Sequence, residues 1–511
     1  MFPLYLYFSD QQVKWSATQL WNNIPAYYCI DEQELIPQLL ELNKTTNNRF
    51  QKQAQGWIKA IRSDQDQQHY LDQFLKTFSL ETEEGVVLMS LAETLLRIPD
   101  QKTADALIED KLTSAQWQLY MDANHSVLLN STVWGLAISQ HLISSESSPD
   151  NIFSQLLDRI SRPVIRKALQ QAMKYLGERF VFAPTIAQGV QRIHDLGANQ
   201  TCSFDMLGEA AVTNLDAKRY FSAYLDAIET VANTDYLDRP APSVSIKLSA
   251  LCPRLEPLKD DQAVNTVVER MLHLVLVARN HNVQITIDAE ESGRQELMLQ
   301  IFSALYHNEI CKDWGGLGIA VQAYSKRALP ILGWLSFIAD QQQTPIPVRL
   351  VKGAYWDTEI KLAQQAGLPD YPVYTQKQAT DLSYQVCVQY LLGDNCALLQ
   401  PQFASHNATT ICHILSHASD SSKKLEFQRL HGMGEAIYSQ ILAQQPDIIL
   451  RIYSPIGPHQ QLLPYLVRRL LENGANSSFV LQQFDPEVSV GQLTQTPCRY
   501  LNETQQFRNS A

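Results

Sequence analysis

The 511-residue sequence lacks several features that would place it in a specialised class of protein. No apolar run reaches the ~18 residues that a membrane-spanning helix needs. Basic side chains are in deficit, 41 against 53 acidic ones, and the net charge of −12 argues against a dedicated nucleic-acid binder. The eight cysteines form no CxxC pair, and the apolar N-terminal "MFPLYLYF" has no basic lead of a secretion signal. We therefore expect reduced thiols, a cytoplasmic location and no nucleic-acid partner.

Phosphate-binding motifs are also missing. There is no GxxxxGK[ST] sequence and no complete GxGxxG, since "HGMGEA" at 431–436 lacks the third glycine. A separate Rossmann-type cofactor domain is therefore not expected.

The first third of the chain has helical periodicity and a polar character. "QKQAQGWIKAIRS" and "VVLMSLAETLLRI" place apolar residues at helical spacing, and "SSESSPDN" at 144–151 suggests a hinge. We predict an all-helical N-terminal region over residues 1–176 that serves packing or dimerisation. A polar C-terminal tail is predicted over residues 491–511.

Residues 177–490 alternate short β-rich runs with helical stretches. The eight candidate strands are centred near Phe204, Ile246, Ile287, Val321, Leu350, Phe403, Phe427 and Ile452. Strands that alternate with helices indicate parallel pairing, and eight such units in about 300 residues fit a closed (β/α)8 barrel of the TIM type. An open doubly wound sheet is the alternative.

A polar side chain stands at or just after the end of each candidate strand. These are Asp205 or Glu209, Lys247, Asp288 with Glu290, Gln322 with Tyr324, Lys352, His406, His431 and Tyr453. Because barrel enzymes carry their active sites at the carboxyl ends of the strands, we expect a functional rim there.

The residue types on this rim leave three kinds of function open. An excess of cations, with Arg349, Arg468 and Arg469 added to the lysines, favours an anionic ligand. A metal-dependent lyase or hydrolase that uses Asp288, His406 and His431 is a second reading. A non-catalytic binding or scaffold protein is a third.

Six ordered motifs then resemble one family. They are "SIKLSAL", "IDAEES", "VRLVKGAYW", "PQFASHNA", "FQRLHGMGE" and "YLVRRLLENGANSSFV". Together they are similar to the flavin-dependent proline dehydrogenase domain, in the form found in bacterial bifunctional proline-utilisation flavoproteins. The resemblance implies a distorted (β/α)8 barrel with non-covalent FAD. The implied reaction is oxidation of L-proline to pyrroline-5-carboxylate by hydride transfer to flavin N5, with quinone as the electron acceptor.

The resemblance also implies roles for individual residues at the substrate. Arg468 and Arg469, on the helix after the last strand, would clamp the proline carboxylate with Lys247 as a third cation. Further residues would enclose the pyrrolidine ring, orient the groups of the site or control entry of the substrate. They are Tyr355, Tyr453, Leu350, Asp288, Glu472 and Glu209.

A second set would contact the cofactor. Arg349 would lie near flavin N5 and Gln322 at the pyrimidine side. The remaining expected contacts follow the fifth strand or serve the outer part of FAD. They are Val351, Lys352, Gly353, Trp356, Thr375 and His406.

The sequence departs from the bifunctional form at both ends. It ends at Ala511, which leaves no room for an aldehyde dehydrogenase domain, so a separate enzyme is expected to take the product. It begins in the helical region, without the small DNA-binding module of some members. Quinone reduction implies transient contact with the inner membrane, and the N-terminal helices could support a homodimer.

Overall fold

A computed structural model describes residues 2–9, 15–43, 48–63, 180–236, 239–256, 261–418, 421, 423–457, 479–483, 485, 487–504 and 507–508. The chain divides into two compact units. The first comprises residues 1–59, 185–456 and 489–511, and the second comprises residues 60–184 and 457–488. The predicted hinge at 144–151 lies outside the described residues.

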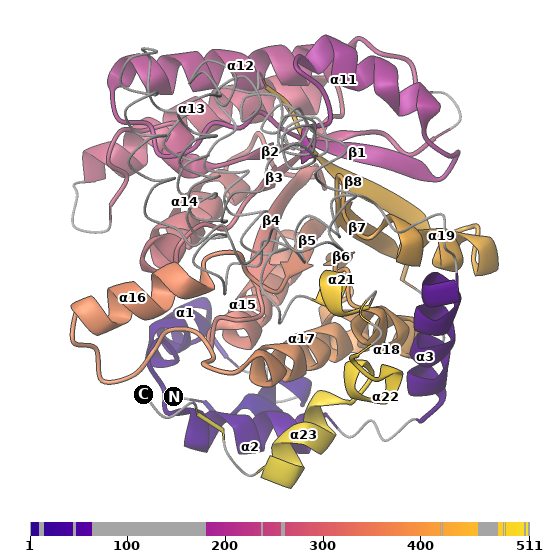
Figure 1. The fold of residues 1–511 in the computed structure, drawn as a ribbon. Helices are drawn as coiled ribbons and strands as arrows, with labels where there is room; N and C mark the ends of the chain where they lie inside the picture. Colours follow the sequence, from indigo (N-terminus) through magenta and orange to yellow (C-terminus); the bar gives the residue numbers. More distant parts are fainter. Residues whose placement is uncertain are drawn as a thin grey trace, which may run out of the picture. The chain divides into compact units, whose positions relative to one another are not determined.

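The first unit is built on a closed barrel of eight parallel strands in sequence order, with β1 paired to β8 (Figure 1). The strands are β1 (Gln200–Asp205), β2 (Ser243–Ile246), β3 (Gln284–Ile287), β4 (Leu317–Gln322), β5 (Ile346–Val351), β6 (Leu399–Ala404), β7 (Glu426–Leu430) and β8 (Ile449–Pro455). All eight predicted strands are confirmed, and the closure excludes the open doubly wound sheet.

The sequence of each strand explains its place in the barrel. The strands are short and largely buried, as expected for parallel strands covered on their outer face by helices. Side chains at i and i+2 of a strand share a face, so Ser203 and Asp205 of β1 project to the same side. Small and polar side chains therefore alternate with apolar ones, and the polar set meets near the barrel axis.

Helices connect the strands and surround them. They are α11 (Ile186–Arg192), α12 (Asn214–Ala232), α13 (Asp261–Asn280), α14 (Gln295–Tyr306), α15 (Ala328–Gln342), α16 (Trp356–Gln365), α17 (Lys377–Leu392), α18 (Ala408–Ala418) and α19 (Glu435–Gln444). Several begin at a side-chain cap; Thr213 and Asp216 form a capping box at the start of α12. Short 3₁₀ turns follow β2 at Leu248–Ala250 and precede α14 at Ser292–Arg294.

Helices from both ends of the chain pack on the barrel helices of the same unit (Figure 1). They are α1 (Ala17–Ala26) and α2 (Glu32–Leu42) from the N-terminal side and α23 (Pro497–Thr504) from the C-terminal side. The structure also has α3 (Asn48–Ser63), which includes residues of both units, and α22 (Val490–Leu493). Helix α1 lies against α15, where the rings of Trp21 and Trp334 meet edge to face at 5.2 Å. Helices α2 and α23 both contact α17. This packing explains why α15 is apolar around most of its circumference.

The helical prediction for the N-terminal region is confirmed where the structure describes it, including "QKQAQGWIKAIRS" within α3. The stretch "VVLMSLAETLLRI" lies outside the described residues. The predicted boundaries at residues 176 and 490 stay predictions. Among the helices that the structure describes, none is long and apolar enough to span a membrane.

In the second unit, the described residues form a small hydrogen-bonded group. The Arg62 guanidinium donates to the backbone carbonyls of Gln482 at 3.2 Å, Gln483 at 2.8 Å and Val488 at 2.8 Å. Helix α21 (Phe479–Gln482) supplies the first of these carbonyls. The Gly457 amide donates to the Ala183 carbonyl at 3.1 Å.

Candidate active site

Four side chains from four strands meet at the carboxyl end of the barrel. The Lys247 ammonium, directly after β2, donates to Asp205 Oδ2 at 2.7 Å and to the Tyr453 hydroxyl at 3.3 Å. Asp288, directly after β3, brings its Oδ2 to 3.8 Å from Lys247 Nζ. Asp205 and Tyr453 lie on β1 and β8, whose pairing closes the barrel. Three of these residues were predicted for the site, and closure of the barrel brings them together.

Arg349 supports this group from β5 across the barrel interior. Its guanidinium donates to Ser245 Oγ at 3.0 Å, to Ser203 Oγ at 2.9 Å and to Asp288 Oδ1. The two serine hydroxyls are themselves 2.9 Å apart. The guanidinium carbon lies 5.3 Å from the centre of the Tyr453 ring, within cation–π range. Arg349 therefore holds Asp288 in place through Oδ1 and packs against the face of the Tyr453 ring.

The buried charges of this cluster balance. Burial opposes ionisation of Asp205, but the ion pair and hydrogen bond from Lys247 outweigh it and hold the pKa of this carboxyl below its usual value. Burial likewise disfavours the Lys247 ammonium, but Asp205, Asp288 and Glu209 outweigh it and raise the pKa of Lys247. With Arg349 as the second cation and Asp288 as the second anion, two positive groups face two negative ones.

The Tyr453 hydroxyl lies between the two carboxylates. It is 2.8 Å from Asp205 Oδ2 and 2.6 Å from Asp288 Oδ2. Burial, together with these two anions, raises the pKa of Tyr453 well above its usual value, so the phenol keeps its proton. One hydroxyl hydrogen serves only one acceptor at a time. The hydroxyl hydrogen therefore goes to one carboxylate at a time, and Asp288 is the nearer of the two acceptors.

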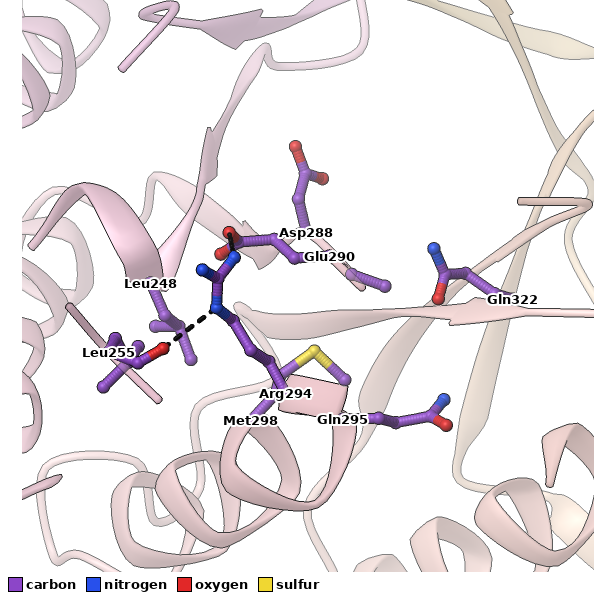
Figure 2. Close-up of a pocket in the computed structure, with 9 residues that line it drawn as sticks. Leu248, Leu255, Asp288, Glu290, Arg294, Gln295, Met298 and Gln322 are labelled. Carbon is purple, nitrogen blue, oxygen red and sulfur yellow. Dashed lines mark hydrogen bonds and ion pairs between the residues drawn. The ribbon is translucent and has the colours of Figure 1, made fainter. Parts of the chain in front are cut away.

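A pocket opens beside this cluster, between the ends of β2, β3 and β4 and the start of α14 (Figure 2). It encloses about 310 Å³ of empty space, part of it open to solvent. Figure 2 shows Arg294 reaching across it, where Nε donates to the Leu255 carbonyl at 2.9 Å and a terminal nitrogen lies 3.5 Å from Glu290 Oε2. Asp288 and Gln322 contribute to the same lining, so two predicted site residues share this pocket.

The end of β5 carries several predicted cofactor contacts. The Lys352 ammonium pairs with Asp381 of α17 and lies 5.9 Å from the Tyr384 ring centre. Gly353 has a φ of +128°, and a Cβ built there would come within 2.4 Å of the Tyr324 ring. Tyr355 precedes α16, and Trp356 begins it. The backbone at Gly353 thus requires glycine, which turns the chain sharply after the strand.

The other predicted contacts lie on β5, after β6 and before α17. Leu350, predicted for the substrate site, is fully buried in β5, and Val351, predicted for the cofactor, ends that strand. Thr375 is buried, and its amide and hydroxyl both donate to Glu32 of α2. His406 follows β6, and its Nε2 accepts the Leu430 amide hydrogen at 3.0 Å.

The alternative metal site receives no support from this arrangement. Within the part of the chain that the structure describes, no three His, Cys, Asp or Glu side chains are grouped so that they could hold a metal ion. The Nε2 lone pair of His406 is engaged by the Leu430 amide, so this nitrogen is not free to ligate a metal. Asp288 is engaged by Arg349 and Tyr453.

The structure describes the predicted gate residue Glu209 but not the predicted clamp. Arg468, Arg469 and Glu472 lie outside the described residues. Glu209 lies in the loop after β1 and is half-buried. That loop holds Leu207 and Ala210 at φ values of 54° and 47°, a left-handed conformation that non-glycine residues rarely adopt.

Sequence reasoning gave Asp205 no role in the site, although it was one of two candidates for the end of its strand. The register of the β1–β2 pair shows its place, because Asp205 aligns with Ser245 and so lies close to Lys247, two residues further on. Gln402 of β6 was missed altogether. It aligns with Arg349 in the β5–β6 pair, is buried, and its Oε1 has no hydrogen-bond partner among the described residues.

Comparisons with known proteins give a family for the chain. A family model described as "Proline dehydrogenase" matches residues 189–482. A second model, described as "DNA-binding domain of Proline dehydrogenase", matches residues 70–180. This second match runs against the expectation of a chain without a DNA-binding module, and it gives no support to the expectation of no nucleic-acid partner.

Curated relatives agree with the first model. The chain is 39% identical over 512 residues to the bifunctional protein PutA of Escherichia coli (strain K12), covering 96% of this chain and 38% of that protein. It is 26% identical over 311 residues to proline dehydrogenase 1 of Bacillus subtilis (strain 168), covering 60% of this chain and 89% of that protein. The chain thus spans less than half the length of the PutA relatives that it matches.

Solved structures give the same result. A crystal structure of a Bradyrhizobium japonicum proline utilization A (PutA) mutant superposes with a TM-score of 0.72 and 41% identity, covering 94% of this chain and 49% of that one. The inactivated PutA from Bdellovibrio bacteriovorus superposes with a TM-score of 0.64 and 26% identity. That comparison covers 88% of this chain and 44% of the Bdellovibrio chain.

Proposed function

The chain belongs to the proline dehydrogenase family, and from this premise we propose that it is an FAD-dependent enzyme that oxidises L-proline to pyrroline-5-carboxylate. The observation that carries the proposal is the charge-balanced cluster of Asp205, Lys247, Asp288, Arg349 and Tyr453 at the carboxyl end of the barrel. Such a cluster holds fixed charges in place before a substrate arrives, which is how a binding site orients a small zwitterion.

Lys247 serves as a cation for the substrate carboxylate. Its raised pKa keeps it protonated at neutral pH, so it binds an anion and does not act as a base. Because Asp205 and Asp288 already balance the two buried cations, an added carboxylate needs further positive charge. Arg468 and Arg469 are the proposed source of that charge, as a bidentate clamp.

The residues present fit a flavin. Arg349 Nε and Gln402 Oε1 are buried polar atoms without partners among the described residues, and their strands align them in register. One is a donor and the other an acceptor, and the edge of an isoalloxazine ring offers both kinds of group. FAD, when bound, supplies the acceptor for the two electrons that leave the C–H bond of the substrate.

The remaining cofactor contacts follow from the same placement. Gln322 lines the same pocket as Asp288 and is proposed to meet the pyrimidine side. Lys352 and His406 follow neighbouring strands and are proposed to face the phosphate region. Tyr453, held between two carboxylates, and Tyr355 are proposed as walls for the pyrrolidine ring.

We further propose that quinone re-oxidises the enzyme during transient contact with the cytoplasmic face of the membrane, and that an aldehyde dehydrogenase activity consumes the product. The PutA relatives of the chain are described as bifunctional, which supports a coupled second activity. Turnover with a soluble short-chain quinone tests the electron acceptor. Sedimentation with anionic lipid vesicles, before and after proline is added, tests the membrane contact.

The test of the main proposal is the visible absorbance of the purified chain. We expect a flavin spectrum that bleaches when L-proline is added without oxygen. A yellow protein that proline leaves unchanged would refute the substrate, and a colourless protein that stays colourless after incubation with FAD would refute the cofactor.

A matched pair of variants assigns the activity to the cluster. Lys247→Met should retain the flavin spectrum but bleach at a rate at least about a hundred-fold lower, because a buried charge-assisted bond to substrate is lost. Lys312→Met, at a lysine that is largely exposed, removes the same charge away from the site and should bleach like the parent chain. Equal rates for the two variants would remove Lys247 from the mechanism.

A further inference from the structure

A carboxylate from the N-terminal region is buried against the segment that carries a proposed cofactor contact. Glu32, the first residue of α2, has no exposed surface. Its Oε1 accepts the Thr375 amide hydrogen at 2.6 Å, and its Oε2 accepts the Thr375 hydroxyl hydrogen at 2.7 Å. These two residues are 343 positions apart in sequence. A bidentate, charge-assisted contact over such a separation fixes the orientation of one side chain by another.

The surroundings of Glu32 are arranged to hold it there. The Lys326 ammonium, also fully buried, lies 3.8 Å from Glu32 Oε1 and 3.3 Å from Asp370 Oδ1, and it donates to the Ile30 carbonyl at 2.7 Å. Lys326 therefore ties the start of α2 to the segment 370–376 from its other end. The Lys326 ammonium keeps this geometry because moving it would leave a buried ion without its partner.

The segment 370–376 also holds a second proposed cofactor neighbour. The Tyr374 amide donates to the Tyr324 carbonyl at 2.9 Å, which fastens the segment to the end of β4. The Tyr374 carbonyl accepts the indole hydrogen of Trp356 at 2.8 Å. Trp356 and Thr375, both proposed to meet FAD, are thus joined through one short piece of backbone that Glu32 anchors.

We propose that Glu32 is a positioning residue for FAD, which acts through Thr375 and holds the outer cofactor contacts in place from the N-terminal region. This inference rests on the proposed function. It gives α2 a role in the cofactor site beyond packing or dimer contact. The barrel cluster around Lys247 lies on other elements, so loss of Glu32 should weaken FAD binding while the chemistry on proline is unchanged.

The experiment compares Glu32→Gln with Glu34→Gln in the full chain. Glu34 lies on the same first turn of α2 but is exposed, so it controls for the lost charge near the helix start. Apoprotein is titrated with FAD, and the Kd is read from flavin fluorescence. We expect Glu32→Gln to raise the Kd at least about ten-fold, the cost of losing a charge-assisted bond. Glu34→Gln should match the parent chain.

Two further readouts separate positioning from a general loss of stability. At saturating FAD, kcat and the KM for proline of Glu32→Gln should equal those of the parent chain. In a double-mutant cycle with Thr375→Val, the double variant should bind FAD no more weakly than the poorer single variant, because both changes remove the same contact. A generally destabilised protein would lower kcat and give additive effects on Kd.

The outcomes are distinct. An unchanged Kd for Glu32→Gln, or effects that add in the cycle, would overturn the role of Glu32 while the proposed function stands. A parent chain that binds no FAD would overturn both. If Glu32→Gln fails to fold, Thr375→Val decides alone: a normal FAD Kd for that variant refutes the inference, since it removes the group through which Glu32 acts.

Discussion

Loss of stability in mild acid is the most direct quantitative test of the packing between α3 and α18. His413 of α18 is fully buried, and its ring meets the edge of Phe50 from α3 at 5.8 Å. Neither ring nitrogen has a hydrogen-bond partner among the described residues. Burial, reinforced by His417 and opposed by the Gln385 backbone, lowers the pKa of His413 from 6.5 to about 3. Folding therefore requires a neutral imidazole at this position.

The sign and size of the effect follow from proton linkage. Below pH 6.5 the unfolded chain binds a proton on His413 that the folded chain excludes until about pH 3, so stability falls as the pH falls. Each unit of pKa difference corresponds to about 1.4 kcal/mol. Between pH 7.5 and 5.0, this one group should lower the free energy of unfolding by about 2 kcal/mol. The full difference, reached near pH 3, is about 5 kcal/mol.

The assay is urea unfolding followed by far-UV circular dichroism at fixed pH from 7.5 to 5.0. In His413→Leu the proton-binding group is gone and the volume is roughly kept, so the loss over this range should be about 2 kcal/mol smaller than in the parent chain. His281→Leu is the control, since His281 is exposed and an exposed imidazole keeps its contact with water in both states. The reasoning is refuted if His413→Leu and the parent chain lose the same stability between these pH values.

Three further predictions concern the barrel site. Asp205→Asn should lower the free energy of unfolding by about 3 kcal/mol in urea titration, because it leaves the Lys247 charge buried with a weaker partner. Gly353→Ala should lower the melting temperature and the amount of flavin retained, since its Cβ would collide with the Tyr324 ring at a strained φ. Arg469→Ala should raise the KM for proline greatly in steady-state assays while flavin stays bound, because the clamp acts on substrate.

The first two predictions have matched controls, and the third has a refuting outcome. Asp216→Asn removes a carboxylate from the exposed start of α12. Its free energy of unfolding should stay well above that of the Asp205→Asn variant. Gly293→Ala adds a Cβ where no atom lies within 4 Å, and a melting temperature as low as that of Gly353→Ala would contradict the steric argument. An unchanged KM in Arg469→Ala would remove the clamp from the mechanism.

The eight barrel strands could be predicted from sequence because the pattern of apolar residues in a strand is a local property of the chain. The runs around Ile246 and Ile452 each place apolar residues between turn signals, and the structure has β2 and β8 there. The rule that barrel sites gather at strand ends then brought Lys247, Asp288 and Tyr453 into one group without any knowledge of distances. Tyr453 shows the limit of that rule, since β8 continues to Pro455 beyond it.

The parts that sequence reasoning missed depend on contacts between distant residues. Nothing near Glu32 in sequence distinguishes it from the exposed Glu34, because its partner Thr375 lies in another part of the chain. Gln402 gained meaning only through its register with Arg349. Registers and long-range pairs follow from how the strands close, and one sequence without relatives carries no signal for them.

The pairing of β1 with β8 also has a consequence for how the protein is made. Tyr453 and Asp205, which meet in the site, are 248 residues apart, so the ribosome must complete that much chain after β1 before the barrel can close. At ~5–20 residues per second, the wait is about 10 to 50 s. Until then, the side of β1 that pairs with β8 has no strand partner and is open to pairing with other chains. Closure of the barrel therefore cannot be completed before β8 has been synthesised, which makes this site one of the last parts of the barrel to assemble.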